Sequence, residues 1–332
     1  MKRYFICTAI LLIIFSLFLT SCSRNNIFGE KKTEEIFHKI TIHTNNESYE
    51  ISVKNGEKIT ALETPQKTNH LFAGWYTDAN FNNKFNLDTE IYYSLSLYAK
   101  FNIDATKLSS KINKEILPSI VTVKFKSFNT KEIFGFDTDE VTKSETHTGT
   151  GVIIASNQSQ THYFVLTTSY VGQIRQGYSK RTLTITDNQG NIYDGTVMKV
   201  DSKYGLSLID FYSRGKKFET VPLAQNAPEI KDSIISICSK PLNIQYSNAY
   251  TYNRPSIENI EEYLYKMKFS LLVYTASNPT NDTGDVLLNS KLEIIGIHCF
   301  NTTMENQGYA IPVNQIEQFL EEHIINKYDP LF

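Results

Sequence analysis

The 332-residue sequence has little of what several functional classes require. It contains four cysteines, one tryptophan and nine prolines, and its formal net charge is −2. Because lysine and arginine are not in excess, there is no basic field for a nucleic acid, and we expect no nucleic-acid partner. No CxxC motif or histidine–cysteine cluster occurs, so we expect neither a metal site nor a cofactor.

A long hydrophobic run is also missing. The longest apolar stretch, Tyr4 to Leu19, follows Lys2 and Arg3. It is shorter than the roughly 20 residues that a membrane-spanning helix needs. A basic start, a short apolar middle and small residues after it are typical of a secretory signal.

The signal-like segment ends in Leu19-Thr20-Ser21-Cys22. This resembles the lipobox of bacterial lipoproteins, which implies cleavage before Cys22 and a diacylglycerol on its sulfur. Residues 1–21 are then the signal peptide and residues 22–38 a polar tether. The resemblance predicts a lipid-anchored protein on the extracytoplasmic face of the cell membrane, since two or more acyl chains anchor stably. The alternative is an ordinary signal peptide with an incidental cysteine.

Two cysteines remain once Cys7 and Cys22 are assigned to this segment. Cys238 and Cys299 both lie in apolar, strand-like runs. An extracellular pair could form a disulfide. The other interpretation is two buried small hydrophobic side chains.

Residues 39–102 have their own pattern. Ile40–His43 and Tyr49–Val53 alternate as short strands, and Asn55-Gly56 is a hairpin signal. The segment resembles the internalin-type B-repeat, a small β-grasp-like module of bacterial surface proteins. The residues that carry this resemblance are Gly56, Pro65, Phe72, Gly74-Trp75-Tyr76, Asp78, Phe81 and Leu97-Tyr98-Ala99-Lys100-Phe101. Such modules act as spacers or contact surfaces.

The next stretch is a junction. A helical pattern (ATKLSSKINKEIL) is stopped by Pro118, and Ile120–Val123 is typical of a strand. The highly charged segment from Phe125 to His147 is predicted to be a surface loop.

Several later blocks follow one another in a recognisable order. They are TGTGVII (148–154), YFVLTTSYV (163–171), DSKYGLSLI (201–209), TGDVLLNSKLEIIGIH (283–298) and GYAIPV (308–313). Their order resembles the trypsin-like serine proteases of the HtrA/Deg type. The resemblance implies that residues 103–332 form two packed antiparallel β-barrels closed by a helix from Asn314 to about Ile325, without a PDZ domain. The expected fold class is therefore mainly β.

All three catalytic positions of that family have changed. The base position falls on Tyr170, the carboxylate position on Gly205 and the nucleophile position on Thr283, or on Asp282 if the register is counted forward from Asn278. A phenol titrates near pH 10, so it is a poor general base at neutral pH. Glycine has no carboxylate to orient a histidine, and a threonine hydroxyl needs a neighbouring base. We therefore expect no catalytic residues.

A binding cleft could remain after the catalytic residues are lost. Backbone donors before Gly284 and the strand around Ile297 and His298 are predicted to line a groove whose free edge, Ile295–Phe300, pairs with an extended peptide. Relocated catalysis would need another base. His147, Asp285 or an Asp282–His298 pair are the candidates that the sequence offers.

Three functions remain open. The leading hypothesis is a surface lipoprotein whose inactive protease-like domain binds a peptide or protein partner. The first alternative is a divergent serine-type endopeptidase with relocated catalytic groups. The second is an adhesin that acts through the B-repeat.

Overall fold

The structure is a computed structural model that describes residues 35–45, 47–60, 62–131, 140–173, 176–253, 267–275, 283–302 and 307–325. The predicted signal peptide, Cys22 and Asp282 lie outside the described residues. In the described ranges, no helix has both the length and the apolar character needed to cross a bilayer.

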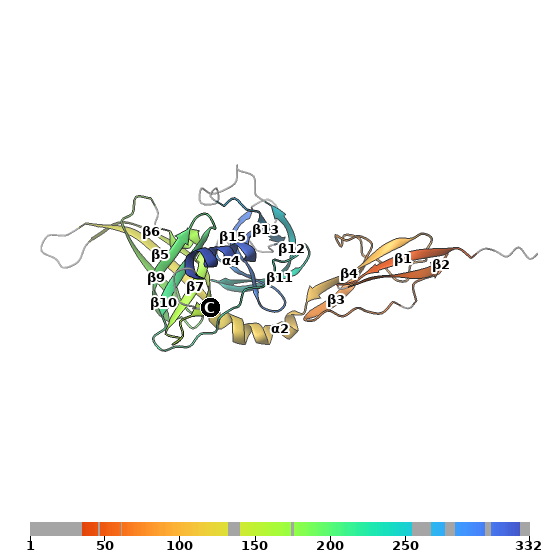
Figure 1. The fold of residues 1–332 in the computed structure, drawn as a ribbon, viewed down its shortest axis with the longest axis horizontal. Coiled ribbons are helices and arrows are strands. Elements are labelled where there is room, and N and C mark those ends of the chain that lie inside the picture. Colours follow the sequence, from red (N-terminus) through yellow and green to blue (C-terminus); the bar gives the residue numbers. More distant parts are fainter. Residues whose placement is uncertain are drawn as a thin grey trace, which may run out of the picture.

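The fold is mainly β, as the sequence predicts. A four-stranded sheet at one end is joined through helix α2 to two closed six-stranded antiparallel barrels at the other end, which carry a short C-terminal helix (Figure 1).

The N-terminal sheet has the strand order β2-β1-β4-β3. Its strands are β1 (Phe37–His43), β2 (Ser48–Lys54), β3 (His70–Tyr76) and β4 (Leu95–Ile103). The central pair, β1 and β4, runs parallel, while the outer pairings are antiparallel. One face packs on Trp75, which is 3% exposed, so the single tryptophan is a core anchor.

A short helical connector joins this sheet to the barrels. Helix α2 (Ala105–Lys111) begins at Asp104, whose side chain accepts a hydrogen bond from the Lys107 backbone N–H. A π-helical turn, η1 (Ile112–Ile116), and a 3₁₀ turn, η2 (Leu117–Ser119), follow. The predicted helix is thus present, but only its first half is α-helical, and Pro118 lies within the 3₁₀ turn that ends at Ser119.

The first barrel closes in the order β10-β7-β6-β5-β8-β9. Its strands are β5 (Ile120–Lys131), β6 (Glu140–Ser156), β7 (His162–Thr168), β8 (Lys180–Thr186), β9 (Ile192–Asp201) and β10 (Leu206–Tyr212). Five buried aromatic rings, those of Phe125, Tyr163, Tyr193, Phe211 and Phe218, belong to its core. On β5 and β8, buried and more exposed positions alternate, which sets the inward face of these strands.

The prediction of a surface loop from Phe125 to His147 is wrong. Both ends of that segment are strand: Phe125 pairs with His147, and the antiparallel ladder continues to Lys131 opposite Glu140. Threonine and valine favour extended backbone even among charged neighbours, and the outward-facing positions tolerate the charges. The high charge therefore marked an exposed strand face.

The second barrel closes in the order β11-β12-β13-β16-β15-β14. Its strands are β11 (Ser233–Ser239), β12 (Leu242–Asn253), β13 (Leu271–Thr275), β14 (Val286–Leu288), β15 (Ile294–Thr302) and β16 (Gln307–Pro312). Helix α4 (Val313–Leu320) and the π-helical turn η5 (Glu321–Ile325) follow, so the predicted terminal helix is present. Phe319 on α4 meets Tyr204 of the first barrel at 6.0 Å between ring centroids.

A buried ion pair supports one turn of the first barrel. The Asp187 side chain is fully buried, and Lys216 Nζ lies 2.7 Å from its Oδ2. Burial raises the pKa of this carboxyl, but hydrogen bonds from Lys216 and Asn191 outweigh burial and lower the pKa to about 2. The charged form is therefore the one that the fold stabilises.

This pair gives a prediction about acid stability. Because the folded pKa lies below the ordinary value of 3.8, the stabilisation is present above about pH 4 and is lost as the pH falls towards 2. We expect Asp187→Asn to lower the free energy of unfolding at pH 7 by about 2 kcal/mol. Urea denaturation at pH 7 and pH 2.5 should show the difference shrinking at the lower pH. A difference that is the same at both pH values would contradict the assignment.

Candidate functional site

The three positions predicted to correspond to a catalytic triad come together where the two barrels meet. Tyr170 lies on the single turn α3 (Ser169–Gly172), directly after β7. The Ser169 backbone N–H donates to the Gly205 carbonyl at 2.7 Å, which joins this turn to the start of β10. Thr283 reaches across from the second barrel, and its carbonyl accepts a 2.9 Å bond from the Thr150 N–H.

The hydroxyl at the nucleophile position faces a second hydroxyl. Thr283 is 7% exposed, and its Oγ1 lies 2.9 Å from Oγ1 of Thr168. Neither hydroxyl is a proton acceptor of useful strength at neutral pH, so this hydrogen bond does not activate Thr283. Sequence reasoning missed Thr168, because nothing in its motif distinguishes it from the strand residues around it.

A methionine side chain crowds Gly205, the predicted carboxylate position. Gly205 has a φ of +71°, and a Cβ built on it would lie 2.5 Å from Met267 Sδ and 3.3 Å from Ile311 Cδ1. Met267 itself is 3% exposed. An aspartate at position 205 would therefore collide with this thioether, and no sequence signal pointed to Met267.

A histidine–glutamate pair lies beside the base position. The rings of His147 and Tyr170 meet edge to face with centroids 5.1 Å apart. His147 Nε2 lies 2.8 Å from Glu145 Oε1. The structure therefore places His147, one of the candidate relocated bases, against the phenol of Tyr170 at the predicted base position.

Of the predicted groove residues, Gly284 takes part in a backbone hydrogen bond, whereas the side chains of Ile297 and His298 are buried. Gly284 takes a φ of +94°, and its N–H donates to the His298 carbonyl at 2.8 Å. Ile297 and His298 are 0% and 1% exposed. Their side chains therefore face the interior and do not line an open groove.

The predicted free strand edge is also corrected. Strand β15 pairs with β14 from Ile294 to Ile297 and with β16 from Gly296 to Thr302. The His298 N–H continues the first ladder by donating to the Asp285 carbonyl. Over Ile295–His298, barrel closure thus occupies the edge that a peptide would need. Among the described strands, the residues of the predicted edge that follow His298 pair with β16 and with no second strand.

His298 is a buried neutral histidine. Its Nδ1 lies 3.0 Å from the Tyr274 hydroxyl. Burial lowers the pKa of His298 to about 4 and, together with the nearby Asp285 charge, raises the pKa of Tyr274. The pair is uncharged at neutral pH, which is consistent with a structural hydrogen bond in the core.

A polar contact joins the two barrels beneath the triad positions. Asp285, which is 6% exposed, accepts a 3.0 Å hydrogen bond from the Thr150 hydroxyl. Cys238 lies nearby, and burial, followed by the Asp285 charge, raises its pKa to about 11. Cys238 and Cys299 are both buried and do not form a disulfide, so of the two interpretations of this pair the structure has the two buried small side chains.

One group of side chains has the composition of a cation site. Asp201, Glu322 and His323 place one potential ligand atom each within 4.8 Å of one another. His323 Nε2 already bonds Asp201 Oδ2 at 2.7 Å, and the Lys203 ammonium lies 2.8 Å from Glu322 Oε1. Lysine therefore supplies positive charge to this cluster, and a metal ion would have to displace it.

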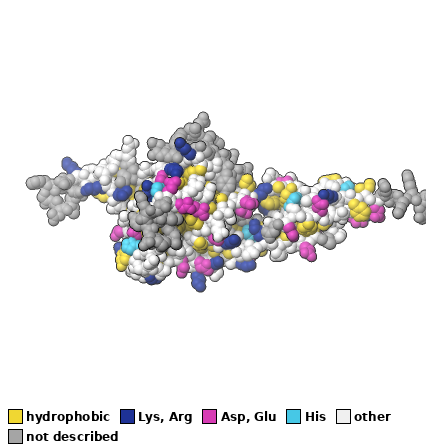
Figure 2. Space-filling view, in the orientation of Figure 1, with side chains coloured by type: hydrophobic (Ala, Val, Ile, Leu, Met, Phe, Trp, Pro, Cys, Tyr) yellow, Lys and Arg dark blue, Asp and Glu magenta, His cyan; other side chains and the backbone are white. Residues whose placement is uncertain are grey.

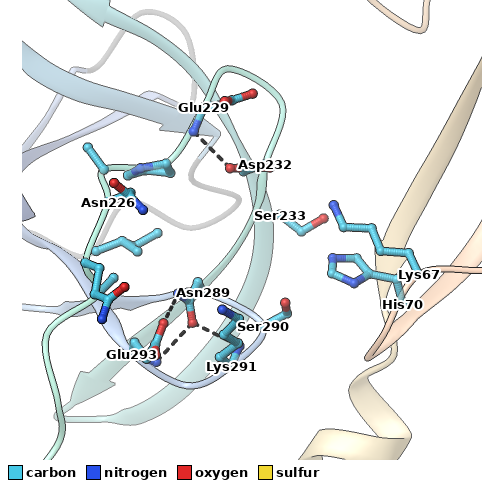
Figure 3. A pocket seen from close by; sticks show the side chains of 15 residues that line it. Lys67, His70, Asn226, Glu229, Asp232, Ser233, Asn289, Ser290, Lys291 and Glu293 are labelled. Carbon is cyan, nitrogen blue, oxygen red and sulfur yellow. Dashed lines mark hydrogen bonds between the residues drawn. The ribbon is translucent and has the colours of Figure 1, made fainter. Parts of the chain in front are cut away.

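A polar pocket of about 620 Å³ lies between the N-terminal sheet and the second barrel (Figure 3). Lys67 and His70 come from the sheet side, whereas Asp232, Ser233 and Glu293 come from the barrel. Over the visible face of the whole molecule, charged side chains of both signs are interspersed (Figure 2).

The comparisons with known proteins agree with the N-terminal part of this description. The model of the Listeria–Bacteroides repeat domain matches residues 38–100. The repeat predicted from the Gly74-Trp75-Tyr76 trio and its neighbours is therefore confirmed. A search of curated proteins found no match.

Proposed function

We propose that this protein is a lipid-anchored bacterial surface protein whose trypsin-like domain, of HtrA type, no longer cleaves and instead binds a peptide or protein partner. The two closed barrels with a C-terminal helix support the trypsin-like assignment. The repeat domain at 38–100 supports a surface location, because the resemblance is to modules of bacterial surface proteins.

One observation carries the loss of catalysis. The hydroxyl in the nucleophile position is bonded to another hydroxyl, while Met267 crowds Gly205, the predicted carboxylate position. Losing the triad typically reduces turnover by about a millionfold. What persists is a rigid two-barrel scaffold that holds surface loops in place.

The test is incubation of the full-length protein in detergent with casein and with a fluorophosphonate probe. We expect no labelling and no cleavage, and Thr283→Ala should behave like the parent. Labelling that Thr283→Ala abolishes would establish the endopeptidase alternative.

The His147–Glu145 pair is the observation that favours this alternative, because it brings an imidazole to the triad region. His147→Ala is therefore the second arm of the test. Cleavage that is lost in this variant would assign the base to His147 and would overturn the proposal.

The anchoring is tested separately. We expect Cys22→Ala to move most of the protein from the membrane fraction to the medium or the wash, since the acyl chains would be missing. Cell fractionation and blotting would measure this. Unchanged membrane retention of the variant would contradict lipid anchoring.

A further inference from the structure

The pocket between the repeat domain and the second barrel carries opposite charges on facing sides. Lys67 belongs to the repeat side, together with His70, while the barrel side carries Glu229, Asp232 and Glu293 and one cation, Lys291 (Figure 3). Lys67, His70, Asp232 and Glu293 are half-buried, whereas Glu229 and Lys291 are exposed. Within the described residues, none of Lys67, Asp232 and Glu293 takes part in an ion pair.

These charges are open to pairing with groups of opposite charge on a ligand. A half-buried charge without a partner has lost part of its hydration and gained no Coulomb attraction in return. Among the described residues, the contact of the Lys67 ammonium is with the Phe101 ring, whose centroid lies 6.0 Å away. The facing carboxylates accept hydrogen bonds from their own loops: Asp232 from the Glu229 N–H and Glu293 from the Asn289 amide.

His70 lies within the electrostatic reach of both sides. Its Nδ1 donates to the Thr68 carbonyl, because a carbonyl oxygen only accepts. Burial lowers the pKa of His70, and the Lys67 charge acts in the same direction, against the opposing effect of Asp232. The ring is therefore neutral at pH 7, which leaves its Nε2 as an acceptor at the pocket.

The pocket is held at a fixed width by contacts beside it. The Asn69 amide donates to the Ser290 carbonyl at 2.8 Å across the boundary, and the Lys231 ammonium lies 5.4 Å from the centre of the Phe81 ring. These contacts join the repeat domain to the barrel while leaving the opposite charges around the cavity unpaired. A cavity of about 620 Å³ lies within the usual range for small-ligand sites.

We propose that this pocket binds a short peptide by its free ends, with the ammonium terminus at Asp232 and Glu293 and the carboxylate terminus at Lys67. A zwitterionic ligand matches both sides at once, and charge-assisted hydrogen bonds would compensate the desolvated groups. This deepens the peptide-binding part of the proposed function and moves the binding site from the triad region to the boundary between the domains.

The experiment is calorimetric titration of the full-length protein in detergent with four forms of tetraalanine: free at both ends, N-acetylated, C-amidated and capped at both ends. We expect one-to-one binding of the free form and a loss of about tenfold in affinity for each cap. The double variant Asp232→Asn/Glu293→Gln should bind the free and acetylated forms equally, and Lys67→Met should bind the free and amidated forms equally.

Matched controls remove the same charges elsewhere. Asp194→Asn and Lys114→Met change exposed residues outside the pocket and should leave all four affinities unchanged. Absence of binding by free tetraalanine, or equal binding of all four forms, would overturn the inference. A non-additive effect of Lys67→Met and Asp232→Asn on thermal stability, measured without peptide, would also overturn the inference. It would mean that the two residues pair with each other.

The outcomes also separate this inference from the proposed function. A decapeptide capped at both ends is titrated in parallel and recovered for mass spectrometry. If it binds intact while the tetraalanine series shows no dependence on its ends, recognition of termini fails and non-hydrolytic peptide binding stands. If it is recovered cleaved, the proposed function itself fails.

Discussion

Gly284→Ala should cost at least about 4 kcal/mol of folding free energy, a large fraction of the roughly 5–15 kcal/mol by which proteins are usually stable. Gly284 has a φ of +94°, and a Cβ at this position would lie 2.1 Å from the Thr150 carbonyl oxygen. The obstacle is the backbone of β6 in the first barrel, so it cannot rotate away as a flexible side chain would. Circular dichroism during thermal unfolding would measure the loss.

Gly190→Ala is the matched control for this prediction. Gly190 also has a positive φ, +86°, but nothing lies within 4 Å of the position its Cβ would take. Only the left-handed backbone is then penalised, at about 1–2 kcal/mol. If the two variants lose equal stability, the close approach of Gly284 to Thr150 is not the reason that glycine is needed there.

His298 should make the protein sensitive to mild acid. Its folded pKa of about 4 lies below the ordinary 6.5, so between these values the unfolded chain binds a proton that the folded chain does not. Stability therefore falls as the pH falls through this window, by about 3 kcal/mol in total. Urea denaturation at pH 7, 5.5 and 4.5 would follow the loss.

His298→Gln isolates this contribution. Glutamine does not titrate, and its amide oxygen can accept a hydrogen bond from the Tyr274 hydroxyl in place of Nδ1. The variant should show a smaller loss than the parent between pH 6.5 and 4, whatever its stability at pH 7. Parallel curves for the two proteins would mean that His298 does not titrate in this window. The comparison is needed because the pKa of His70 is lowered as well.

The sequence predicted where in the fold the residues of the candidate site lie, but not which side chains surround them. The motif around Leu166 and Thr167 located Tyr170, and the Ile295-Gly296-Ile297 strand located Thr283. The consequences of those substitutions depended on residues outside the motifs. Met267 occupies the space beside Gly205 although it lies 62 positions along the chain, and Thr168 meets Thr283 across 115 positions.

The predicted groove failed for a related reason. The sequence does not show which strands pair with Ile295–Phe300. We therefore predicted that this strand has a free edge. In the closed barrel, β14 and β16 take up the two sides of this strand, and the side chain of His298 lies in the interior. The same limit explains why Phe125 to His147 was predicted to be a loop: a strand exposed on one face shows its charges in the sequence but not its ladder.

The sequence by itself determined the repeat domain and the mainly β class, because turn residues and alternation are local properties, and it predicted the loss of the triad from the chemistry of single side chains. Tertiary structure alone decided what surrounds those positions: the hydroxyl pair at Thr283, the methionine at Gly205 and the facing charges of Lys67 and Asp232. Such neighbours come from distant segments, and the barrel closure and domain packing that bring them within contact distance have no counterpart in any local pattern.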